Sequence, residues 1–123
     1  MSTVLDSTVV IDVLRGSPEA LEYLTSLSQV PVCSEITRVE IIRGLRSRER
    51  GATERLFHTL RWEPVGEVVA RAAGEFGREY RRSHPGISSA DLLIAATASQ
   101  LGLKVATTNV RRYPMFPRLR PPY

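Results

Sequence analysis

The sequence predicts an α/β fold in which a parallel sheet is flanked by helices. Short apolar segments of strand type alternate along the chain with segments of helical periodicity. Such alternation is typical of parallel sheets covered by helices. The 123 residues contain no repeat, low-complexity segment or linker, so residues 1–123 are expected to form a single domain.

The N-terminal segment is expected to form a buried strand over residues 3–5 and then two helices. Ser7 or Thr8 can cap the first helix, which Gly16 closes after Leu14. Ser17–Pro18 opens the second helix, because proline is favoured in the first helical turn. The leucines of this second helix are predicted to face inward: Leu21, Leu24 and Leu27.

The central segment is expected to hold two strands with two helices between them. The second strand is predicted near Val30–Cys33 and the third over residues 62–65. One intervening helix runs from Thr37, and another covers residues 52–61. The helix from Thr37 is predicted to have one apolar face: Val39, Ile42 and Leu45.

The C-terminal part is expected to contain two helices, a fourth strand and an irregular tail. Residues 68–82 have a helical pattern that Gly74 and Gly77 weaken, since glycine is a poor helix former. Residues 88–102 begin with serine and end with glycine, which are typical helix boundaries. The fourth strand is predicted over residues 104–108, and the proline-rich segment 114–123 is expected to be irregular.

Polar side chains fall where a parallel sheet collects its ligands. Asp6 follows the first predicted strand, Asn109 follows the fourth, and Glu40 lies in the first turn of the helix after the second strand. The carboxyl ends of parallel strands and the starts of the following helices share one edge of the sheet. Asp6, Glu40 and Asn109 are therefore expected at one rim, and Asp91 joins them if its helix also begins there.

Each of these acids also has a structural interpretation. Glu40 and Asp91 each follow a threonine or serine by three residues, which is the capping-box pattern at the start of a helix. Asp6 can cap the helix that follows it. Asp12 lies inside that helix and is expected to make a structural bond rather than to take part in catalysis.

The charge balance favours a cation among these acids. The chain has a formal net charge of +4, and its basic residues are sixteen arginines and one lysine. Arginine suits polyanionic partners, although a GC-rich genome explains the same bias equally well. Acids clustered in a basic protein repel one another, and Mg²⁺ prefers carboxylate and water oxygens. Asp6 is therefore expected to face a divalent metal.

Four segments make the chain similar to the PIN-domain family, and within it to the VapC toxins of bacterial toxin–antitoxin pairs. In order along the chain, from Val4 to Tyr123, the segments are VLDSTVVIDVLRG, SEITRVEIIRGL, SSADLLIAATASQLGLKVATTN and NVRRYPMFPRLRPPY. The resemblance implies a PIN-like fold of three layers, α/β/α, with an acidic site that binds Mg²⁺ or Mn²⁺.

Residue by residue, the resemblance assigns Asp6, Glu40 and Asp91 to catalysis and metal binding. Asn109 is assigned to catalysis with them, at a position where many PIN domains have a fourth acid. An amide there removes one negative charge but can still orient a water molecule. Arg112 stands where relatives often have aspartate or histidine, and it is expected to contact phosphate.

Arginines are predicted to bind the phosphates of RNA, which makes binding sensitive to salt. Arg43, Arg46 and Arg50 follow Glu40 at or near helical spacing and are predicted to form a basic stripe. Arg43 and Arg46, together with Arg112, are the candidate substrate contacts. A solvated helix face explains any one of these arginines equally well.

The resemblance implies a metal-dependent endoribonuclease toxin that cleaves structured RNA, either tRNA or ribosomal RNA, by metal-activated water. It also implies a homodimer and a cognate VapB-like antitoxin, through which alone the pair contacts DNA. The single cysteine, and the lack of a signal peptide or of an apolar run that could cross a bilayer, predict an intracellular protein without membrane contact. Together with the resemblance, this implies a location in the bacterial cytoplasm.

Three other functions are compatible with an aspartate at this strand end. A non-catalytic RNA-binding PIN domain would keep the shape without cleavage, and a PIN-like DNA nuclease would use the same acids. A phosphoacceptor receiver domain also has an aspartate at a strand end. The receiver function is disfavoured, because Asp6 lacks an acidic neighbour and Lys104 begins its strand rather than ending it.

Overall fold

The computed structural model describes residues 2–123, and within this range it contains one four-stranded parallel sheet. The strand order is β3-β2-β1-β4, so β1 lies inside the sheet between β2 and β4. The strands are β1 (Thr3–Leu5), β2 (Val32–Ser34), β3 (Arg61–Glu63) and β4 (Lys104–Ala106). The predicted parallel sheet is confirmed, although β2, β3 and β4 differ from the predicted boundaries by one or two residues.

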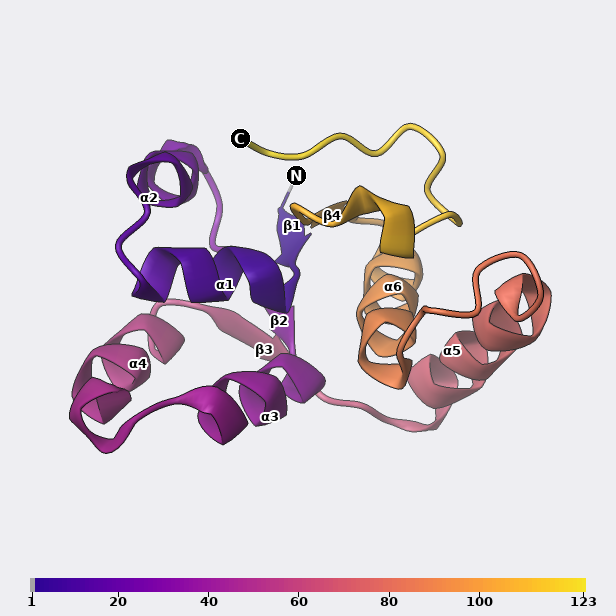
Figure 1. Ribbon diagram of the computed structural model, residues 1–123, viewed down its shortest axis with the longest axis horizontal. Coiled ribbons are helices and arrows are strands. Elements are labelled where there is room, and N and C mark those ends of the chain that lie inside the picture. The colour runs from indigo at the N-terminus through magenta and orange to yellow at the C-terminus, as the bar shows by residue number, and fades with distance from the viewer. Residues whose placement is uncertain (1) are drawn as a thin grey trace.

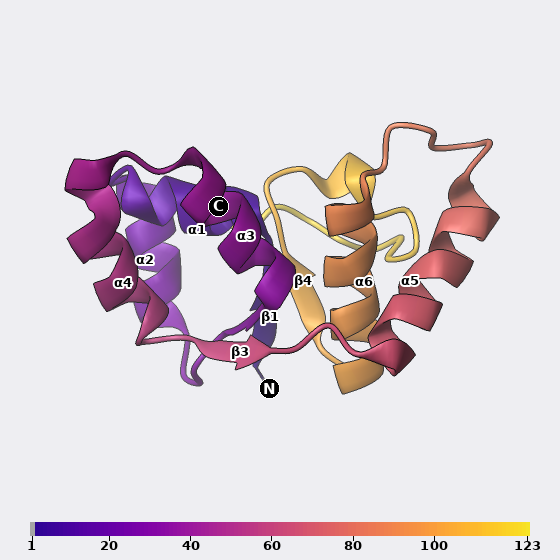
Figure 2. The same ribbon diagram turned by 90° about the horizontal axis from the view of Figure 1, so that it is seen from below.

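Helices cover both faces of the sheet, which confirms the three-layer α/β/α architecture. Within residues 2–123 there are six α-helices: α1 (Ser7–Leu14), α2 (Pro18–Ser26), α3 (Glu35–Gly44), α4 (Arg50–Phe57), α5 (Glu67–Tyr80) and α6 (Ser89–Leu101). Helices α1, α2 and α4 lie on one side, and α5 and α6 lie on the other (Figures 1 and 2). Helix α3 lies between these groups and contacts both α1 and α6. None of the helices in the described range combines the length and the apolar character needed to cross a membrane.

The second and third residues of β1 and of β4 are apolar and buried, because helices cover both faces of the sheet at these strands. Val4 and Val105 belong to a hydrophobic cluster that includes Ile94 of α6. Their neighbours Leu5 and Ala106 belong to a second cluster, on the side of α1 and α4. Successive strand residues point to opposite faces, so a sheet covered on both sides needs continuous apolar segments.

Helix α1 ends at Leu14 as predicted, but it begins at Ser7, because its cap is Asp6, as the structural interpretation of that acid predicts. The carboxylate of Asp6 caps the helix by accepting a hydrogen bond from the Ser7 N–H, so the prediction of Ser7 or Thr8 as the cap is wrong. Gly16, just beyond α1, and Gly102, at the end of α6, have φ of 79° and 66°. Both predicted glycine stops are thus confirmed, since left-handed backbone favours glycine.

Helix α3 begins earlier than predicted. Ser34 caps it by accepting a hydrogen bond from the Ile36 N–H, so Thr37 lies inside the helix rather than at its start. Glu40 consequently lies in the second turn, and the predicted capping box of Thr37 with Glu40 is wrong. The serine that ends β2 is the stronger cap, because it stands where the extended backbone turns into the helix.

Most of the predicted apolar face of α3 is exposed, and so is one of the three leucines of α2 predicted to face inward. Val39 and Ile42 of α3 are 57% and 38% exposed, whereas Thr37 and Ile41 of the same helix are buried. Helix α3 turns Thr37 and Ile41 inward because it must fit between α1 and α6. Leu21 of α2 is also largely exposed, at 42%.

The C-terminal segment is irregular, as predicted, and it returns from the α6 side of the molecule to the α1–α2 side (Figure 1). The Tyr123 ring stacks on Tyr23 of α2, with a centroid separation of 6.1 Å and an interplanar angle of 12°. The Tyr123 hydroxyl donates to Asp12 Oδ2 of α1 at 2.6 Å. Asp12 therefore makes a structural bond, as expected.

Two glycines inside α5 provide a paired test of how closely α5 packs on α6. A Cβ at Gly77 would lie 3.1 Å from Leu92 Cδ1, whereas a Cβ at Gly74 would meet no atom within 4 Å. We expect Gly74→Ala to raise the free energy of unfolding by up to about 1 kcal/mol, since alanine is the better helix former. Gly77→Ala is expected to gain less or to destabilise, because Leu92 must move. Urea denaturation measures both, and equal stabilisation would contradict the close approach.

Cys33 provides a test of burial in the sheet through the pH dependence of stability. Burial of the Cys33 side chain raises the pKa of its thiol from 9.0 to about 12. A raised folded-state pKa gives stability that is complete below the unfolded pKa and is lost as pH rises toward the folded one. Relative to Cys33→Ala, the wild type is expected to lose about 1 kcal/mol of unfolding free energy between pH 7.5 and 9.5. Denaturation curves at the two pH values measure this difference, and a constant difference would show that the thiol is not buried.

Candidate functional site

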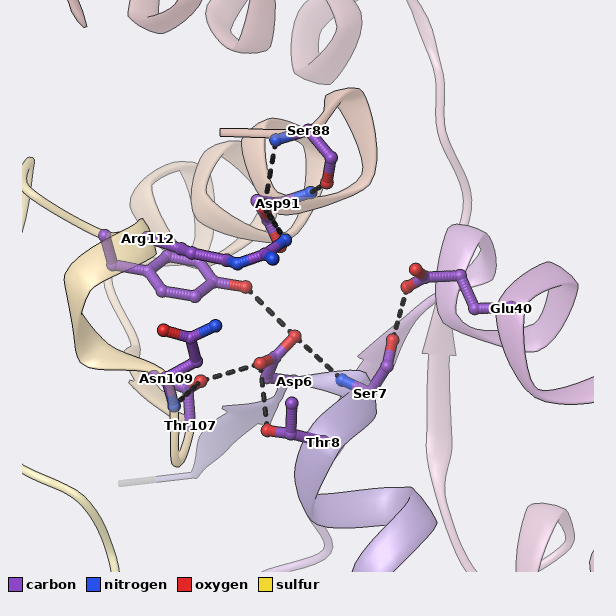
Figure 3. A network of polar contacts seen from close by, with 10 residues as sticks. Asp6, Ser7, Thr8, Glu40, Ser88, Asp91, Thr107, Asn109 and Arg112 are labelled. Atoms are coloured by element: carbon purple, nitrogen blue, oxygen red, sulfur yellow. Dashed lines mark hydrogen bonds and ion pairs between the residues drawn. The ribbon is translucent and has the colours of Figure 1, made fainter. Parts of the chain in front are cut away.

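Asp6 is the centre of a polar network at the carboxyl end of β1. Its side chain is almost fully buried, with the residue 4% exposed. Oδ1 accepts hydrogen bonds from the Ser7 N–H at 2.8 Å and from the Tyr113 hydroxyl at 3.0 Å. Oδ2 accepts from the Thr107 hydroxyl at 2.6 Å and the Thr8 hydroxyl at 3.0 Å (Figure 3). A carboxylate offers about four acceptor positions, so the protein occupies all those of Asp6.

Strand β4 supplies the support for Asp6 from the neighbouring edge of the sheet. The Asp6 N–H donates to the Ala106 carbonyl at 2.9 Å. The next residue, Thr107, is fully buried, donates to Asp6 and accepts from the Asn109 N–H at 3.0 Å. Asn109 therefore lies at the same rim as Asp6, as predicted (Figure 3).

Ser7 connects Asp6 with Glu40 of α3. Its backbone N–H donates to Asp6, and its hydroxyl donates to Glu40 Oε1 in a short hydrogen bond. The Ser7 hydroxyl also lies 3.5 Å from the buried Thr37 hydroxyl, one turn before Glu40. Glu40 thus reaches the predicted rim from the second turn of α3.

Asp91 lies in the first turn of α6 and forms an ion pair with an arginine. The predicted capping box is confirmed: the Ser88 N–H donates to Asp91 Oδ2 at 3.0 Å, and the Asp91 N–H donates to Ser88 Oγ at 3.1 Å. Asp91 Oδ2 also accepts from Arg112 Nη1 at 3.2 Å. Arg112, for which phosphate contact is predicted, is therefore held by Asp91 in this structure (Figure 3).

The Tyr113 phenol lies within the electric field of all three acids. Its residue is 1% exposed, and burial raises the pKa of the hydroxyl far above its usual range. The negative charges of Asp6, Asp91 and Glu40 raise this pKa further. The phenol consequently stays protonated at physiological pH and remains a donor to Asp6.

The donors at this rim suit a hard divalent cation chemically, but they do not surround one point. Carboxylate, hydroxyl and amide oxygens are the ligands that Mg²⁺ and Mn²⁺ prefer. Among the described residues, Asp91 Oδ1 and Glu40 Oε2 take part in no hydrogen bond, so each is available to a ligand. No group of three His, Cys, Asp or Glu side chains in residues 2–123 is close enough to hold a metal ion. The side chains are therefore of the type that binds such a cation, but in this structure the three acids are not close enough together to bind one ion jointly.

The sequence identified the acids but not the donors that hold Asp6. Ser7 and Thr8 directly follow Asp6, and Thr107 directly follows β4, so their position next to strand ends was an available signal. Tyr113 belongs to a core cluster. Its hydrogen bond to Asp6, 107 positions away, has no local sequence signal.

The arginines after Glu40 lie outside this network and do not form one stripe. Arg43 is in the last turn of α3, Arg46 precedes the short 3-10 helix η1 (Ser47–Glu49), and Arg50 begins α4. The predicted single helical stripe is wrong because α3 ends at Gly44. Arg43 and Arg46 are exposed, and within the described part of the chain neither forms an ion pair.

Comparisons with known proteins agree with this fold. The PIN-domain family model matches residues 3–118. Ribonuclease VapC19 of Mycobacterium tuberculosis (strain ATCC 25618 / H37Rv) is 43% identical over 122 residues, which cover 97% of this chain and 98% of that protein. Ribonuclease VapC10 of the same strain is 44% identical over 121 residues, with 97% and 91% covered. A chain of a toxin–antitoxin complex from Klebsiella pneumoniae has the same fold, with a TM-score of 0.86, 24% identity, and coverage of 99% of this chain and 98% of that chain. This chain therefore belongs to the PIN-domain family.

Proposed function

We propose that this protein is a VapC-type endoribonuclease, the toxin of a bacterial toxin–antitoxin pair. The observation that carries the proposal is the acidic rim at the strand ends, in a chain 43% identical over nearly its whole length to a protein named as a ribonuclease. The structural neighbour from a toxin–antitoxin complex has the same fold.

Asp6, Glu40 and Asp91 are proposed to hold Mg²⁺ or Mn²⁺. Such a cation, when bound, lowers the pKa of water and neutralises negative charge on a phosphodiester. Glu40 and Asp91 each have a carboxylate oxygen that takes part in no hydrogen bond among residues 2–123. Asp6 becomes a ligand when one hydroxyl turns away from it. At Oδ2, the Thr8 hydroxyl is the more weakly held of the two donors, because its hydrogen bond is 3.0 Å long against 2.6 Å for Thr107.

The chain's own residues are proposed to orient and deprotonate the attacking water. Asn109 is placed beside Asp6 by Thr107, and its side-chain carbonyl can accept a hydrogen bond from that water. Glu40 is the proposed general base, since its second oxygen is available. Attack of water on phosphorus leaves a 5′-phosphate and a 3′-hydroxyl, whereas attack by the ribose would leave a cyclic phosphate.

The proposed substrate is a structured RNA, tRNA or ribosomal RNA. The net charge of +4 supports a polyanionic substrate, and the exposed Arg43 and Arg46 together with Arg112 are the proposed phosphate contacts. Each of these arginines is close to an acid of the rim in sequence or in space. Arg43 and Arg46 follow Glu40 in the sequence, and Arg112 forms an ion pair with Asp91.

The proposed partners are a second copy of this chain and a cognate VapB-like antitoxin that neutralises the toxin. The toxin–antitoxin complex among the structural neighbours supports the antitoxin. The exposed apolar side chains of Val39 and Ile42 on α3 support a homodimer. DNA is contacted only through the antitoxin, no membrane is involved, and the proposed location is the bacterial cytoplasm.

Replacing Asp6 tests the catalytic role. Asp6→Asn keeps the shape of the side chain but removes its charge, so RNA cleavage is expected to fall by at least about a hundredfold. Asp12→Asn is the matched control, because the carboxylate of Asp12 bonds Tyr123 outside the site. Each variant is expressed in bacteria, and growth and new RNA 5′ ends are measured.

The expected result is growth arrest, with discrete 5′-phosphorylated ends, for the wild type and Asp12→Asn only. RNA binding without any cleavage would indicate a non-catalytic PIN domain, and cleavage of DNA alone would indicate a DNA nuclease. Either result would overturn the proposed function.

Replacing Tyr113 tests whether the hydroxyl network positions Asp6. Tyr113→Phe removes one of the two donors to Asp6 Oδ1, and RNA cleavage is expected to fall about tenfold. Tyr123→Phe is the matched control, since it removes the hydroxyl that donates to Asp12. Cleavage rates of the purified variants are compared at saturating Mg²⁺. Equal rates for the two variants would assign Tyr113 to packing alone.

A further inference from the structure

Arg112 is anchored beside the acids by its neighbours in the chain. It ends the short 3-10 helix η2 (Val110–Arg112), and its N–H donates to the Asn109 carbonyl at 3.2 Å. The next residue, Tyr113, is buried and bonded to Asp6. The backbone of Arg112 is therefore fixed between two residues of the site, and its guanidinium extends to Asp91 (Figure 3).

Arg112 is the one cation paired with the acids of the rim. Over residues 2–123, no other Lys, Arg or His forms an ion pair with Asp6, Glu40 or Asp91. These three carboxylates together raise the pKa of the enclosed Tyr113 hydroxyl. One guanidinium thus offsets only part of the negative charge that they concentrate.

The ion pair of Arg112 with Asp91 is weak and can break without leaving Asp91 unpaired. It consists of a single contact of 3.2 Å, and the Arg112 side chain is 47% exposed, against 10% for Asp91. Water and salt screen such a pair, so it is weak. When Arg112 leaves, Asp91 Oδ2 still accepts the hydrogen bond from the Ser88 N–H at 3.0 Å, so the carboxylate is not left without a partner.

We propose that Arg112 is an internal counter-ion that competes with the divalent cation for Asp91 and so lowers the metal affinity of the free protein. A divalent cation and a guanidinium cannot both lie close to one carboxylate without repelling each other. Binding of either therefore weakens binding of the other by the same factor. The inference rests on the proposed metal-dependent function and goes beyond it, because it assigns Arg112 a role before any RNA is bound.

Titration calorimetry of Mn²⁺ into the RNA-free protein tests the inference. Arg112→Ala is expected to bind Mn²⁺ about three- to fivefold more tightly than the wild type, which is what the loss of a weak ion pair allows. Arg111→Ala is the matched control, because Arg111 is exposed, adjacent and of equal charge, and within the described residues it forms no ion pair. Its affinity is expected to stay within about twofold of the wild type.

A second pair of variants separates competition at Asp91 from a general change of charge. In an Asp91→Asn background, Arg112→Ala is expected to leave Mn²⁺ affinity unchanged, since the carboxylate for which the two cations compete is absent. Arg112→Lys keeps the charge and is expected to keep the affinity near that of the wild type. Equal affinities of Arg112→Ala and Arg111→Ala, or weaker binding by Arg112→Ala, would overturn the inference.

Nuclear magnetic resonance of the wild type gives a readout that does not depend on any variant folding. The Arg112 Nε–H resonance is expected to move when Mg²⁺ is added, while that of Arg111 stays in place. A wild type that binds neither Mn²⁺ nor Mg²⁺ would overturn both this inference and the proposed function. A wild type that binds Mn²⁺ and cleaves RNA, but whose Arg112 resonance does not respond to Mg²⁺, would overturn this inference alone.

Discussion

The burial of one carboxylate, that of Asp6, is the constraint on which the rest of the site depends. A charged group at 4% exposure is stable only when hydrogen bonds replace the water it has lost. Asp6 obtains them from the start of α1, from the end of β4 and from the residue after η2. Three segments of the chain must therefore meet at one point before the acid can be buried. The pairing of β1 with β4 brings two of these segments together.

The three acids of the rim are satisfied in different ways, and this difference shapes the chemistry. Asp6 is fully occupied by protein donors, Glu40 is bonded at one oxygen, and Asp91 is shared between a helix cap and Arg112. Asp6 is thus the rigid member of the set. Glu40 and Asp91 each keep an oxygen atom that is available to a ligand, and Arg112 forms an ion pair with Asp91. Such a site can remain folded without a cation, because no buried side-chain polar atom in residues 2–123 lacks a partner.

Two Asp–Tyr pairs attach the C-terminal segment to the first strand and helix. The Tyr113 hydroxyl donates to Asp6 inside the site, and the Tyr123 hydroxyl donates to Asp12 in α1. Between these anchors the chain crosses the molecule without regular structure (Figure 1). The bond of Tyr113 to Asp6 keeps the adjacent Arg112 at the rim. The contacts of Tyr123 with Asp12 and Tyr23 hold the end of the chain against α1 and α2. The last eleven residues, which follow Arg112, therefore connect the acidic rim to the side of the molecule formed by α1 and α2.

The sequence by itself determined the α/β class, the positions of Asp6 and Asn109 after strands, and the Asp91 capping box, because these follow from local periodicity and cap chemistry. It did not reveal which face of α3 is buried, since Thr37 and Ile41 turn inward only because α1 and α6 enclose them. The Tyr113 and Thr107 donors to Asp6 are 107 and 101 positions away in the chain, and the Arg112 pair with Asp91 spans 21. Contacts of that range depend on how the strands are ordered in the sheet and on where the tail returns. The tertiary structure alone decided them, because hydrogen bonds and ion pairs form by proximity in space, which no local pattern encodes.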